Sequence, residues 1–333
     1  MAVAGAGVFG LCTALRLAAA GAAVDVWDPA PLGDNASGVA GGMIAPAGET
    51  LFDTASARHF PLFAAARAGW RALEALAPQL IIHRSGACFL FDGPQARDAA
   101  LMQLIDAGGS GALLEPENDS RAALFTPDDW RVDAPVALLA LAAAIRAVGG
   151  VFRPEALTPA NIGDYDAVVL ATGMFGHPFI DVVPELAALT PIKGHILRFA
   201  AAPHEGPIQR SASVYLSPQP GGVLAGATME AGRDDRSLDP AVVDALYGRA
   251  IGLDPTLAPA PFQAFTGVRA ATPDGLPLAG PSRHPGVLLA AGARRNGWLL
   301  APLVSQIIVS YLEGGDGGAY APAFDPRRAF QTR

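Results

Sequence analysis

Four residues near the start of the chain have types and spacing suited to holding a dinucleotide. Gly5, Gly7 and Gly10 form a GxGxxG pattern directly after a short apolar segment. The first glycine permits a tight turn, the second lets backbone approach a pyrophosphate, and the third lets a helix pack closely on a strand. Asp28 follows Gly10 by 18 residues, where a carboxylate can accept ribose hydroxyls. The pattern predicts a phosphate-binding turn at a helix that begins at Val8.

Arg269 stands out in the C-terminal third because it interrupts a largely apolar run, Phe262–Ala271. A guanidinium in such a strand needs an anionic partner, and its planar fork matches a carboxylate. Asp274 is the acid nearest in sequence, but it sits in a Pro-Asp-Gly turn that it is expected to cap. Arg269 is therefore either free to bind an anionic ligand or paired with an internal acid from elsewhere.

Strands and helices alternate in the first half of the chain. Apolar runs predict strands, and apolar residues at helical spacing predict helices. The predicted order is strand Ala2–Ala4, helix Val8–Ala20, strand Ala23–Trp27, loop Pro29–Gly48, helix Ala55–Ala77, strand Ile81–Phe91, helix Pro94–Ala107, helix Ala134–Val148, strand Val151–Phe152 and strand Asp166–Ala171.

The middle of the chain changes character, with short strand-like runs separated by Pro and Gly. The remaining predicted elements are strands Lys193–Phe199, Ser213–Ser217 and Gly222–Ala227, helix Pro240–Ile251, strands Phe262–Arg269 and Val287–Ala291, helix Trp298–Leu312 and an extended tail 314–333. We predict an α/β protein in which a Rossmann-like GxGxxG domain is interleaved with an α+β domain built on an antiparallel sheet. The expected ranges are 1–80, 130–190 and 265–320 for the first domain, 81–129 and 191–264 for the second, and 321–333 for a tail.

Composition excludes several classes of protein. Of 333 residues, 51% are hydrophobic and 16% are charged, which excludes a disordered chain. The net charge of −8 argues against a nucleic-acid partner, because phosphate binding needs a basic surface. No apolar run reaches the roughly 20 residues that cross a bilayer, and no basic segment precedes the first one. We expect a cytoplasmic protein with no membrane segment.

Metal and hydrolase chemistry have little support in the sequence. The two cysteines, Cys12 and Cys88, form neither a disulfide framework nor a Cys-rich metal site. The six histidines show no pair at i, i+4, and no GxSxG pattern is present. No metal is therefore expected.

Four regions of the chain carry a likeness to a known family. They are Ala4–Asp28, Ala36–Pro46 (ASGVAGGMIAP), Ala167–Gly173 (AVVLATG), and the pair Thr266–Pro281 (TGVRAATPDGLPLAGP) with Ala290–Pro302 (AAGARRNGWLLAP). On these motifs the sequence resembles the D-amino-acid oxidase family of flavin amine oxidases, and within it the glycine oxidases of the thiamine-pathway type.

The resemblance implies FAD as the cofactor and assigns residues to it. Relatives with covalent flavin carry a cysteine close after the arginine motif, and Ala270-Ala271-Thr272 contains none, so the FAD is expected to be non-covalent. The residues implied to bind FAD are Gly5, Gly7, Val8, Phe9, Gly10, Asp28, Ala36, Ser37, Gly41, Gly42, Met43, Thr172, Gly173, Gly292, Asn296, Gly297, Trp298 and Leu299. The alternatives are an ordinary surface loop for 36–43 and a common strand-end turn for Thr172-Gly173.

The resemblance also assigns four residues to the substrate. Arg269 matches the arginine that holds the substrate carboxylate, and Tyr215 matches a tyrosine that touches it or is simply a core residue. Met229 matches a residue of the side-chain pocket, although a buried methionine is often only packing. Arg295 matches an active-site arginine, while its neighbour Arg294 has no assigned place. No catalytic acid or base is required if the amine binds neutral, so none is nominated.

The implied activity is FAD-dependent oxidation of a small amino acid or amine (glycine, sarcosine or a D-amino acid). Oxygen is the expected acceptor, and the products are an imine or oxo acid, ammonia and hydrogen peroxide. A D-amino-acid dehydrogenase that passes electrons to a quinone or carrier is an alternative, as is a sarcosine-type oxidase. A non-catalytic dinucleotide-binding protein is a third possibility. Relatives commonly assemble as homo-oligomers.

Overall fold

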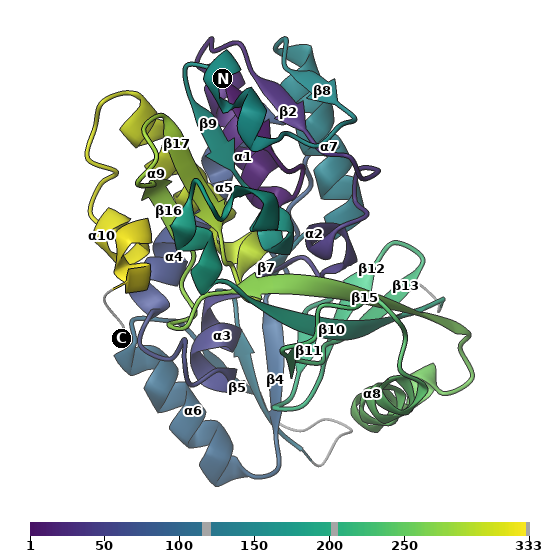
Figure 1. Ribbon diagram of the computed structural model, residues 1–333. Helices are drawn as coiled ribbons and strands as arrows, with labels where there is room; N and C mark the ends of the chain where they lie inside the picture. The colour runs from purple at the N-terminus through teal and green to yellow at the C-terminus, as the bar shows by residue number, and fades with distance from the viewer. Residues whose placement is uncertain (115–120, 201–205, 331–333) are drawn as a thin grey trace.

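Two large sheets form the framework of the molecule (Figure 1). The computed structural model describes residues 1–330 except 115–120 and 201–205. The first sheet is parallel apart from its last pair, β16 and β17, and its order is β16 (Leu278–Pro281), β17 (Val287–Ala291), β9 (Val168–Leu170), β1 (Ala2–Ala4), β2 (Asp25–Trp27) and β8 (Val151–Arg153).

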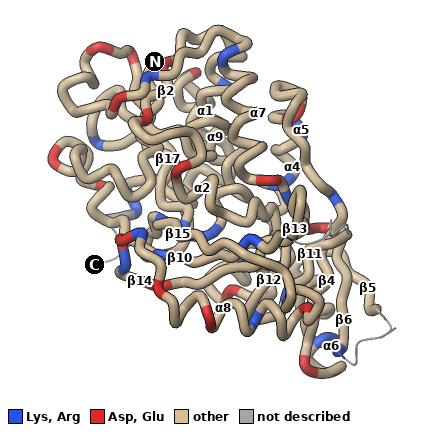
Figure 2. The backbone as a smooth tube through the Cα atoms, turned by 90° about the vertical axis from the view of Figure 1, so that its right-hand side faces the viewer, with Lys and Arg blue, Asp and Glu red and all other residues tan. Residues whose placement is uncertain are grey.

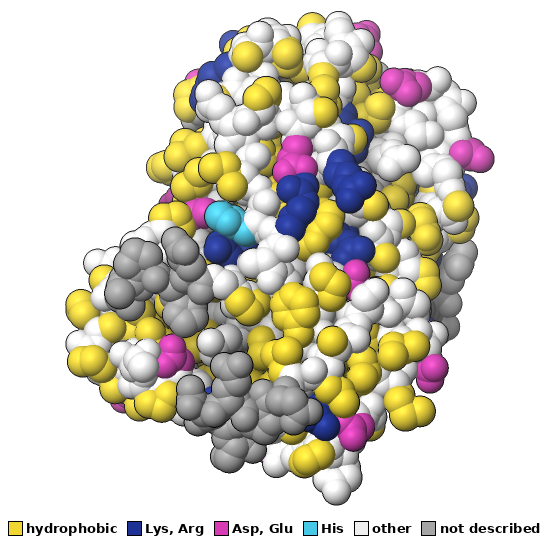
Figure 3. All heavy atoms as spheres, turned by 180° about the vertical axis from the view of Figure 1, so that it is seen from behind, with side chains coloured by type: hydrophobic (Ala, Val, Ile, Leu, Met, Phe, Trp, Pro, Cys, Tyr) yellow, Lys and Arg dark blue, Asp and Glu magenta, His cyan; other side chains and the backbone are white. Residues whose placement is uncertain are grey.

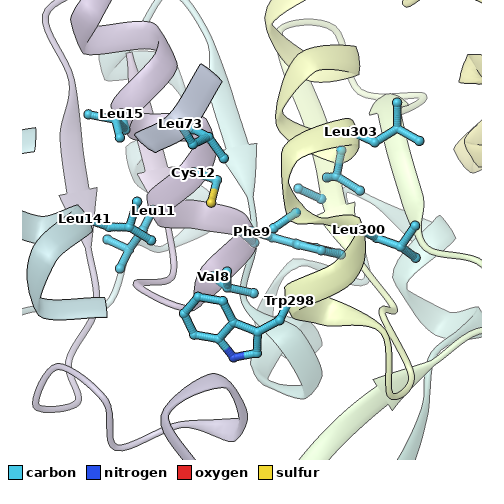
Figure 4. Packing of buried hydrophobic residues seen from close by; sticks show 14 of the residues in the cluster. Val8, Phe9, Leu11, Cys12, Leu15, Leu73, Leu141, Trp298, Leu300 and Leu303 are labelled. Atoms are coloured by element: carbon cyan, nitrogen blue, oxygen red, sulfur yellow. The ribbon is translucent and has the colours of Figure 1, made fainter. Parts of the chain in front are cut away.

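The first sheet is buried on both faces, which explains its run of apolar residues. Val3 packs with three helices, α1 (Val8–Ala19), α7 (Ala134–Ala147) and α9 (Gly297–Leu312). Its neighbours in β1 point the other way, toward the 3₁₀ helices η1 (Pro159–Asp164), η2 (Gly173–Phe179) and η3 (Pro184–Ala188). Figure 4 shows Val8 of α1 beside Trp298 of α9 and Phe9 reaching toward α9, while Leu11 lies on the other side of α1, next to Leu141 of α7.

The second sheet is antiparallel except where β11 pairs with β4. Its order is β14 (Glu230–Ala231), β10 (Thr190–Phe199), β13 (Gly222–Gly226), β12 (Tyr215–Gln219), β11 (Ile208–Arg210), β4 (Ala87–Phe91), β6 (Ala122–Thr126) and β5 (Ala112–Leu114), and β15 (Phe262–Ala271) pairs with β10 along its whole length. A two-stranded ribbon joins β3 (Met43–Ile44) to β7 (Trp130–Arg131).

Helices cover the second sheet on different faces. α8 (Pro240–Leu253) packs on one face, against alternate residues such as Leu197 and Leu216. The other face, which includes Ile196 and Tyr215, meets α3 (Pro46–Phe52), α4 (Phe60–Ala68) and α6 (Pro94–Asp106). The predicted fold class, a Rossmann-like unit interleaved with an antiparallel-sheet unit, is confirmed. The numerical domain ranges stay a prediction.

Several predicted elements have different boundaries. The single helix 55–77 is two helices, α4 and α5 (Trp70–Leu76), which meet at Gly69, where a Cβ would lie 2.8 Å from Pro302 Cβ. The predicted loop 29–48 contains α2 (Ala36–Val39), β3 and the start of α3. The strand predicted to begin at residue 81 begins at Ala87.

The predicted extended tail is wrong over the part that the structure describes. It forms α10 (Ala321–Phe324) and the 3₁₀ helix η5 (Pro326–Phe330), because Ala321 and Phe324 are buried in the main core. Residues 331–333 lie outside the described residues. Among the described residues, no helix combines the length and apolar character needed to cross a bilayer. From behind, neutral and hydrophobic side chains dominate the surface, with a group of basic side chains near its middle (Figure 3).

Candidate active site

The turn between β1 and α1 is built so closely that only glycine fits. Gly5 has φ +109°, and a Cβ on it would lie 2.4 Å from Ala171 O. A Cβ on Gly10 would lie 1.9 Å from Gly5 O, so α1 can approach β1 only through this glycine. Gly7 is the N-cap of α1 and supplies no side-chain cap. Apart from Val8 N, which donates to Ser37 Oγ, the first-turn amides of α1 therefore remain as donors for an anionic ligand.

Asp28 lies at the end of β2, beside this turn, as the spacing predicts. Its Oδ2 accepts a hydrogen bond from Ala6 N at 2.7 Å, and its Oδ1 accepts one from Ala30 N at 2.9 Å. The carboxylate thus fixes the turn, and each oxygen keeps a further lone pair for a hydroxyl donor.

Trp298 and Ser37 connect the glycine turn to the start of α9. Val8 N donates to Ser37 Oγ at 3.0 Å, and Trp298 Nε1 donates to Ser37 O at 3.1 Å. Trp298 O accepts from Trp70 Nε1 at 2.9 Å, and the two indoles stack. A Cβ on Gly297 would lie 3.5 Å from Val8 Cγ1. The N-termini of α1 and α9 are therefore neighbours on one side of the first sheet.

These surroundings fit a bound dinucleotide. Thr172 Oγ1 is buried and has no hydrogen-bond partner within the described chain, so a polar group is available next to the glycine turn. Gly42 has φ +66°, and a Cβ there would lie 2.2 Å from Val132 O. Gly292 likewise has a left-handed φ of +84°, and a Cβ there would lie 2.9 Å from Leu189 and Thr272. The chain itself therefore requires glycine at both positions, and the assignment of Gly292 to the cofactor stays a prediction.

One pocket, called here the inner pocket, brings the two predicted groups of residues together. Arg269, Arg295, Tyr215 and Met229, all predicted to bind substrate, line it. Its other predicted residues, all assigned to the cofactor, are Ala36, Gly41, Gly42, Met43, Asn296, Trp298 and Leu299. The remaining predicted cofactor residues do not line this pocket. Gly5, Gly7, Val8, Phe9, Gly10, Asp28, Ser37 and Gly297 belong to the adjoining glycine turn and its contacts, and Gly173 follows β9.

Two facing glycines open the floor of the inner pocket. Gly194 of β10 lies directly opposite Gly267 of β15, and both line the pocket. The Arg269 guanidinium occupies the space beside them, because a Cβ on Gly194 would lie 2.3 Å from Arg269 Nη1. Strand alternation places residues 267 and 269 on the same face of the sheet.

Arg269 has no ion pair with a carboxylate among the residues that the structure describes. Its Nη1 donates to Thr228 O at 3.1 Å and to Met229 Sδ at 3.4 Å. Burial lowers the pKa of Arg269, and the nearby Arg295 lowers it further. Asp274 caps its own turn, as predicted, by accepting from Leu276 N at 3.1 Å, and it also pairs with Arg328. The guanidinium of Arg269 is thus available to an anionic ligand.

Tyr215 is both a core residue and a pocket residue. It is 7% exposed. A Cβ on Gly41 would lie 2.6 Å from the Tyr215 hydroxyl oxygen, and a Cβ on Gly226 would lie 2.5 Å from it, so the hydroxyl packs against both glycines. Burial raises the pKa of Tyr215 above its usual value, so the phenol stays protonated and can donate a hydrogen bond.

Sequence reasoning missed Glu49, which holds Arg295. Glu49 is 3% exposed, lines the inner pocket and lies between two arginines. Its Oε1 accepts from Arg210 Nη1 at 3.1 Å, and its Oε2 lies 2.9 Å from Arg295 Nε. The carboxylate raises the pKa of Arg295, so that arginine is charged and already partly neutralised. The one signal available was a lone acid in the small-residue stretch Pro46–Glu49.

Two further acids anchor α3, which carries Glu49. Asp129 accepts hydrogen bonds from Ala47 N at 2.8 Å and from Gly48 N at 2.9 Å, and so caps the N-terminus of α3. The two helix residues lie 82 and 81 positions before Asp129 in the sequence. Asp53 pairs with Arg294, whose φ of +52° lies in the left-handed region. Arg294 and Arg295 thus bind two acids of the same segment, and only Arg295 lines the inner pocket.

The family model described as FAD dependent oxidoreductase (DAO) matches residues 1–311. The chain belongs to this family. It is therefore an FAD-dependent oxidoreductase, and the glycine turn and the inner pocket hold residues that fit the cofactor.

One glycine oxidase matches nearly the whole chain in both sequence and fold. The glycine oxidase of Geobacillus kaustophilus is 27% identical in an alignment of 356 positions, which includes 94% of this chain and 92% of that protein. The crystal structure of glycine oxidase from Geobacillus kaustophilus has a TM-score of 0.83 at 25% identity and covers 97% of both chains. The bifunctional protein ThiO/ThiG of Nostoc sp. is 35% identical over 151 residues, 43% of this chain and only 22% of that longer protein.

Proposed function

We propose that this FAD-dependent oxidoreductase oxidises the C–N bond of a small amino acid or amine, such as glycine, sarcosine or a D-amino acid. The imine product hydrolyses to an oxo acid and the amine freed from it, which is ammonia for glycine or a D-amino acid, and oxygen takes up the two electrons and two protons as hydrogen peroxide. The likeness to two proteins named glycine oxidase over nearly the whole chain supports this substrate class.

The observation that carries the proposal is Arg269. A guanidinium without a carboxylate partner among the described residues lines a pocket that also contains Gly41, Gly42 and Asn296, which we assign to the cofactor. Such a fork binds a carboxylate through two charge-assisted hydrogen bonds. A substrate carboxylate on Arg269 therefore lies in the same space as the residues that would border the FAD ring.

The residues of the chain bind and orient, while bound FAD supplies the acceptor for the hydride of the oxidised C–H bond. Arg269 fixes the carboxylate, and protonated Tyr215 can donate a second hydrogen bond to it. Met229 borders the side-chain end of the substrate. The start of α9 at Gly297 places the positive end of a helix dipole beside the pocket, where it favours negative charge.

The net charge of −8, with acidic and basic residues interspersed along the chain (Figure 2), supports a small-molecule substrate rather than nucleic acid. No disulfide joins Cys12 and Cys88 in the described part of the chain, which supports a reducing, cytoplasmic setting. Cys12 lies in the helical core of Figure 4, and neither cysteine lines the inner pocket. We therefore propose that the FAD is held without a covalent bond.

A panel of amino acids and amines scored for hydrogen peroxide tests the proposal. We expect peroxide release with at least one small amino acid, and bleaching of the flavin by the same compound without oxygen. Bleaching without peroxide, relieved by a quinone, would replace the oxidase with a dehydrogenase. No bleaching by any compound would leave a non-catalytic protein.

Acid precipitation tests the non-covalent attachment of FAD. It should leave the yellow colour in the supernatant, and a yellow pellet would overturn non-covalent binding.

A further inference from the structure

A second cavity, called here the outer chamber, shares part of its wall with the inner pocket. Its volume is ≈ 470 Å³, and Tyr215, Ala227, Met229 and Arg295 line both spaces. Met229 is 37% exposed, and its Sδ accepts a hydrogen bond from Arg269 Nη1 at 3.4 Å. A ligand whose carboxylate is held by Arg269 can therefore extend past Met229 toward the outer chamber.

The walls of the outer chamber carry more positive than negative charge. Arg210, Arg249 and Arg295 line it, against one acid, Glu230. Glu230 is already engaged, since its Oε1 lies 2.8 Å from Nδ1 of the buried His195. The chamber is therefore electrostatically suited to an anion.

Arg249 differs from the other two arginines. Arg210 and Arg295 share the carboxylate of Glu49. Arg249 donates only to backbone carbonyls, from Nε to Ala245 O at 3.2 Å and from Nη1 to Ser213 O at 3.4 Å. Among the described residues no carboxylate pairs with it, so Arg249 supplies the uncompensated charge of the chamber.

The loop between β11 and β12 adds neutral donors and space. Ser211 and Ser213 line the chamber with Ala212 between them, and their hydroxyl oxygens lie 3.4 Å apart. Hydroxyl groups can rotate to donate to an anion, and three small side chains leave room for a ligand.

We propose that the outer chamber is a substrate subsite that binds a second carboxylate, carried on the tail of an amino-acid substrate, through Arg249. The inference rests on the proposed function, in which Arg269 holds the α-carboxylate in the inner pocket. An amino acid with an acidic side chain or an acidic N-substituent would then span both cavities, and the tail carboxylate would gain charge-assisted hydrogen bonds that a neutral amide lacks.

Ligand binding to the holoenzyme tests the subsite without turnover. The probes are succinate against succinamate and glutarate against glutaramate, and Kd is measured from the change in the flavin absorbance spectrum. For at least one chain length we expect the dicarboxylate to bind about tenfold more tightly than its monoamide. Arg249→Gln should reduce this ratio to about one, and Arg249→Lys should keep part of it.

Arg233→Gln is the matched control, since Arg233 pairs with Asp235 and lines neither cavity. It should keep the full ratio. A ratio of one in wild type at both chain lengths, or an unchanged ratio in Arg249→Gln, would overturn the subsite. The peroxide assay decides the proposed function separately. If an amino acid releases peroxide but the dicarboxylate and its monoamide bind equally, only the subsite is rejected. If the dicarboxylate binds more tightly as expected but no amine releases peroxide, only the oxidase is rejected.

Discussion

The two sheets contribute to the site in different ways. The first sheet offers backbone: Gly5 and Gly10 allow β1 and α1 to touch, and main-chain amides face the cofactor space. The second sheet contributes side chains: Arg269 and Tyr215 of β15 and β12 line the inner pocket, and Gly194 of β10 leaves the space that the Arg269 guanidinium occupies.

This difference indicates what each half tolerates. Contacts made by backbone fail when a glycine gains a side chain, because the neighbouring backbone cannot move away cheaply. Contacts made by long side chains can shift, because a guanidinium at the end of a flexible stem has other rotamers. A new side chain in the glycine turn of the first sheet should therefore cost both FAD binding and stability. A new side chain at the second sheet should instead alter the affinity for substrate.

The largest effect is expected for Gly10→Ala in the first half. Its new Cβ would lie 1.9 Å from Gly5 O, so α1 must move away from β1. We expect loss of bound FAD and destabilisation by about 3 kcal/mol or more. Flavin content and thermal unfolding measure both. Gly248→Ala in α8, whose Cβ meets nothing within 4 Å, is the control and should stabilise the protein by about 0.5–1 kcal/mol. Normal FAD content in Gly10→Ala would contradict the claim that FAD binding depends on the close backbone contact between β1 and α1.

The same substitution in the second half should have a different outcome. In Gly194→Ala the Cβ would lie 2.3 Å from Arg269 Nη1, and the guanidinium rather than the backbone must move. We expect near-normal FAD content, with substrate affinity lower by roughly 10- to 100-fold as the bidentate pair is lost. The KM and the flavin spectrum report this. An unchanged KM would show that Arg269 in this position does not bind substrate.

Glu49 and Asp53 offer a matched pair of smaller effects. Each pairs with one of two consecutive arginines, but only Glu49 and Arg295 line the inner pocket. Glu49→Gln leaves Arg295 without its carboxylate, so we expect acetate to bind more tightly by about tenfold, or about 1.4 kcal/mol. Asp53→Asn should change the acetate Kd much less, because Asp53 acts on Arg295 only through its charge and forms its ion pair with Arg294. Equal effects in both variants would show that the ion pairs serve only to hold α3.

Asp129 is expected to affect the pH dependence of stability rather than ligand binding. Burial raises the pKa of Asp129 to about 7, although two backbone amides and Arg210 oppose the rise. The folded state then binds more protons than the unfolded state between about pH 4 and 7, so this residue lowers stability as pH rises through that range. Relative to Asp129→Asn, the unfolding free energy should fall by up to about 1.4 kcal/mol per pH unit from pH 5 to 7 and then level off. Urea unfolding at pH 5, 6, 7 and 8 measures this, and parallel curves would contradict the raised pKa.

The sequence predicted the backbone-built half well because its signals are local. The glycine turn, the start of α1 and Asp28 lie within 28 residues, and each glycine has its own steric reason. The interleaved fold class was also predicted, since apolar strands and helical spacing are local patterns. Element boundaries failed where tertiary contacts decide them, as at Gly69 beneath Pro302 and at Phe324 in the tail.

The side-chain-built half was predicted only in part. Arg269 was singled out because a charge interrupts an apolar strand, but Glu49, which pairs with Arg295 and Arg210, was not predicted. Glu49 and Arg210 are 161 residues apart, and Ala47 and Asp129 are 82 apart. No spacing rule links such residues, since the sheet and α3 bring them together only in three dimensions. The counterion network and the outer chamber therefore required the structure.

Anaerobic reduction of bound FAD in wild type and Arg269→Lys tests the central claim most directly. The substrates are the best amino acid of the panel and the amine that lacks only its carboxylate. Lysine keeps the charge but loses the fork, so the amino acid should bind roughly 10- to 100-fold more weakly in the variant. FAD content should stay near normal, and the poor reduction by the carboxylate-free amine should hardly change. If Arg269→Lys loses FAD or unfolds while its remaining holoenzyme reacts with the amino acid as wild type does, Arg269 is a structural residue and does not hold the substrate carboxylate.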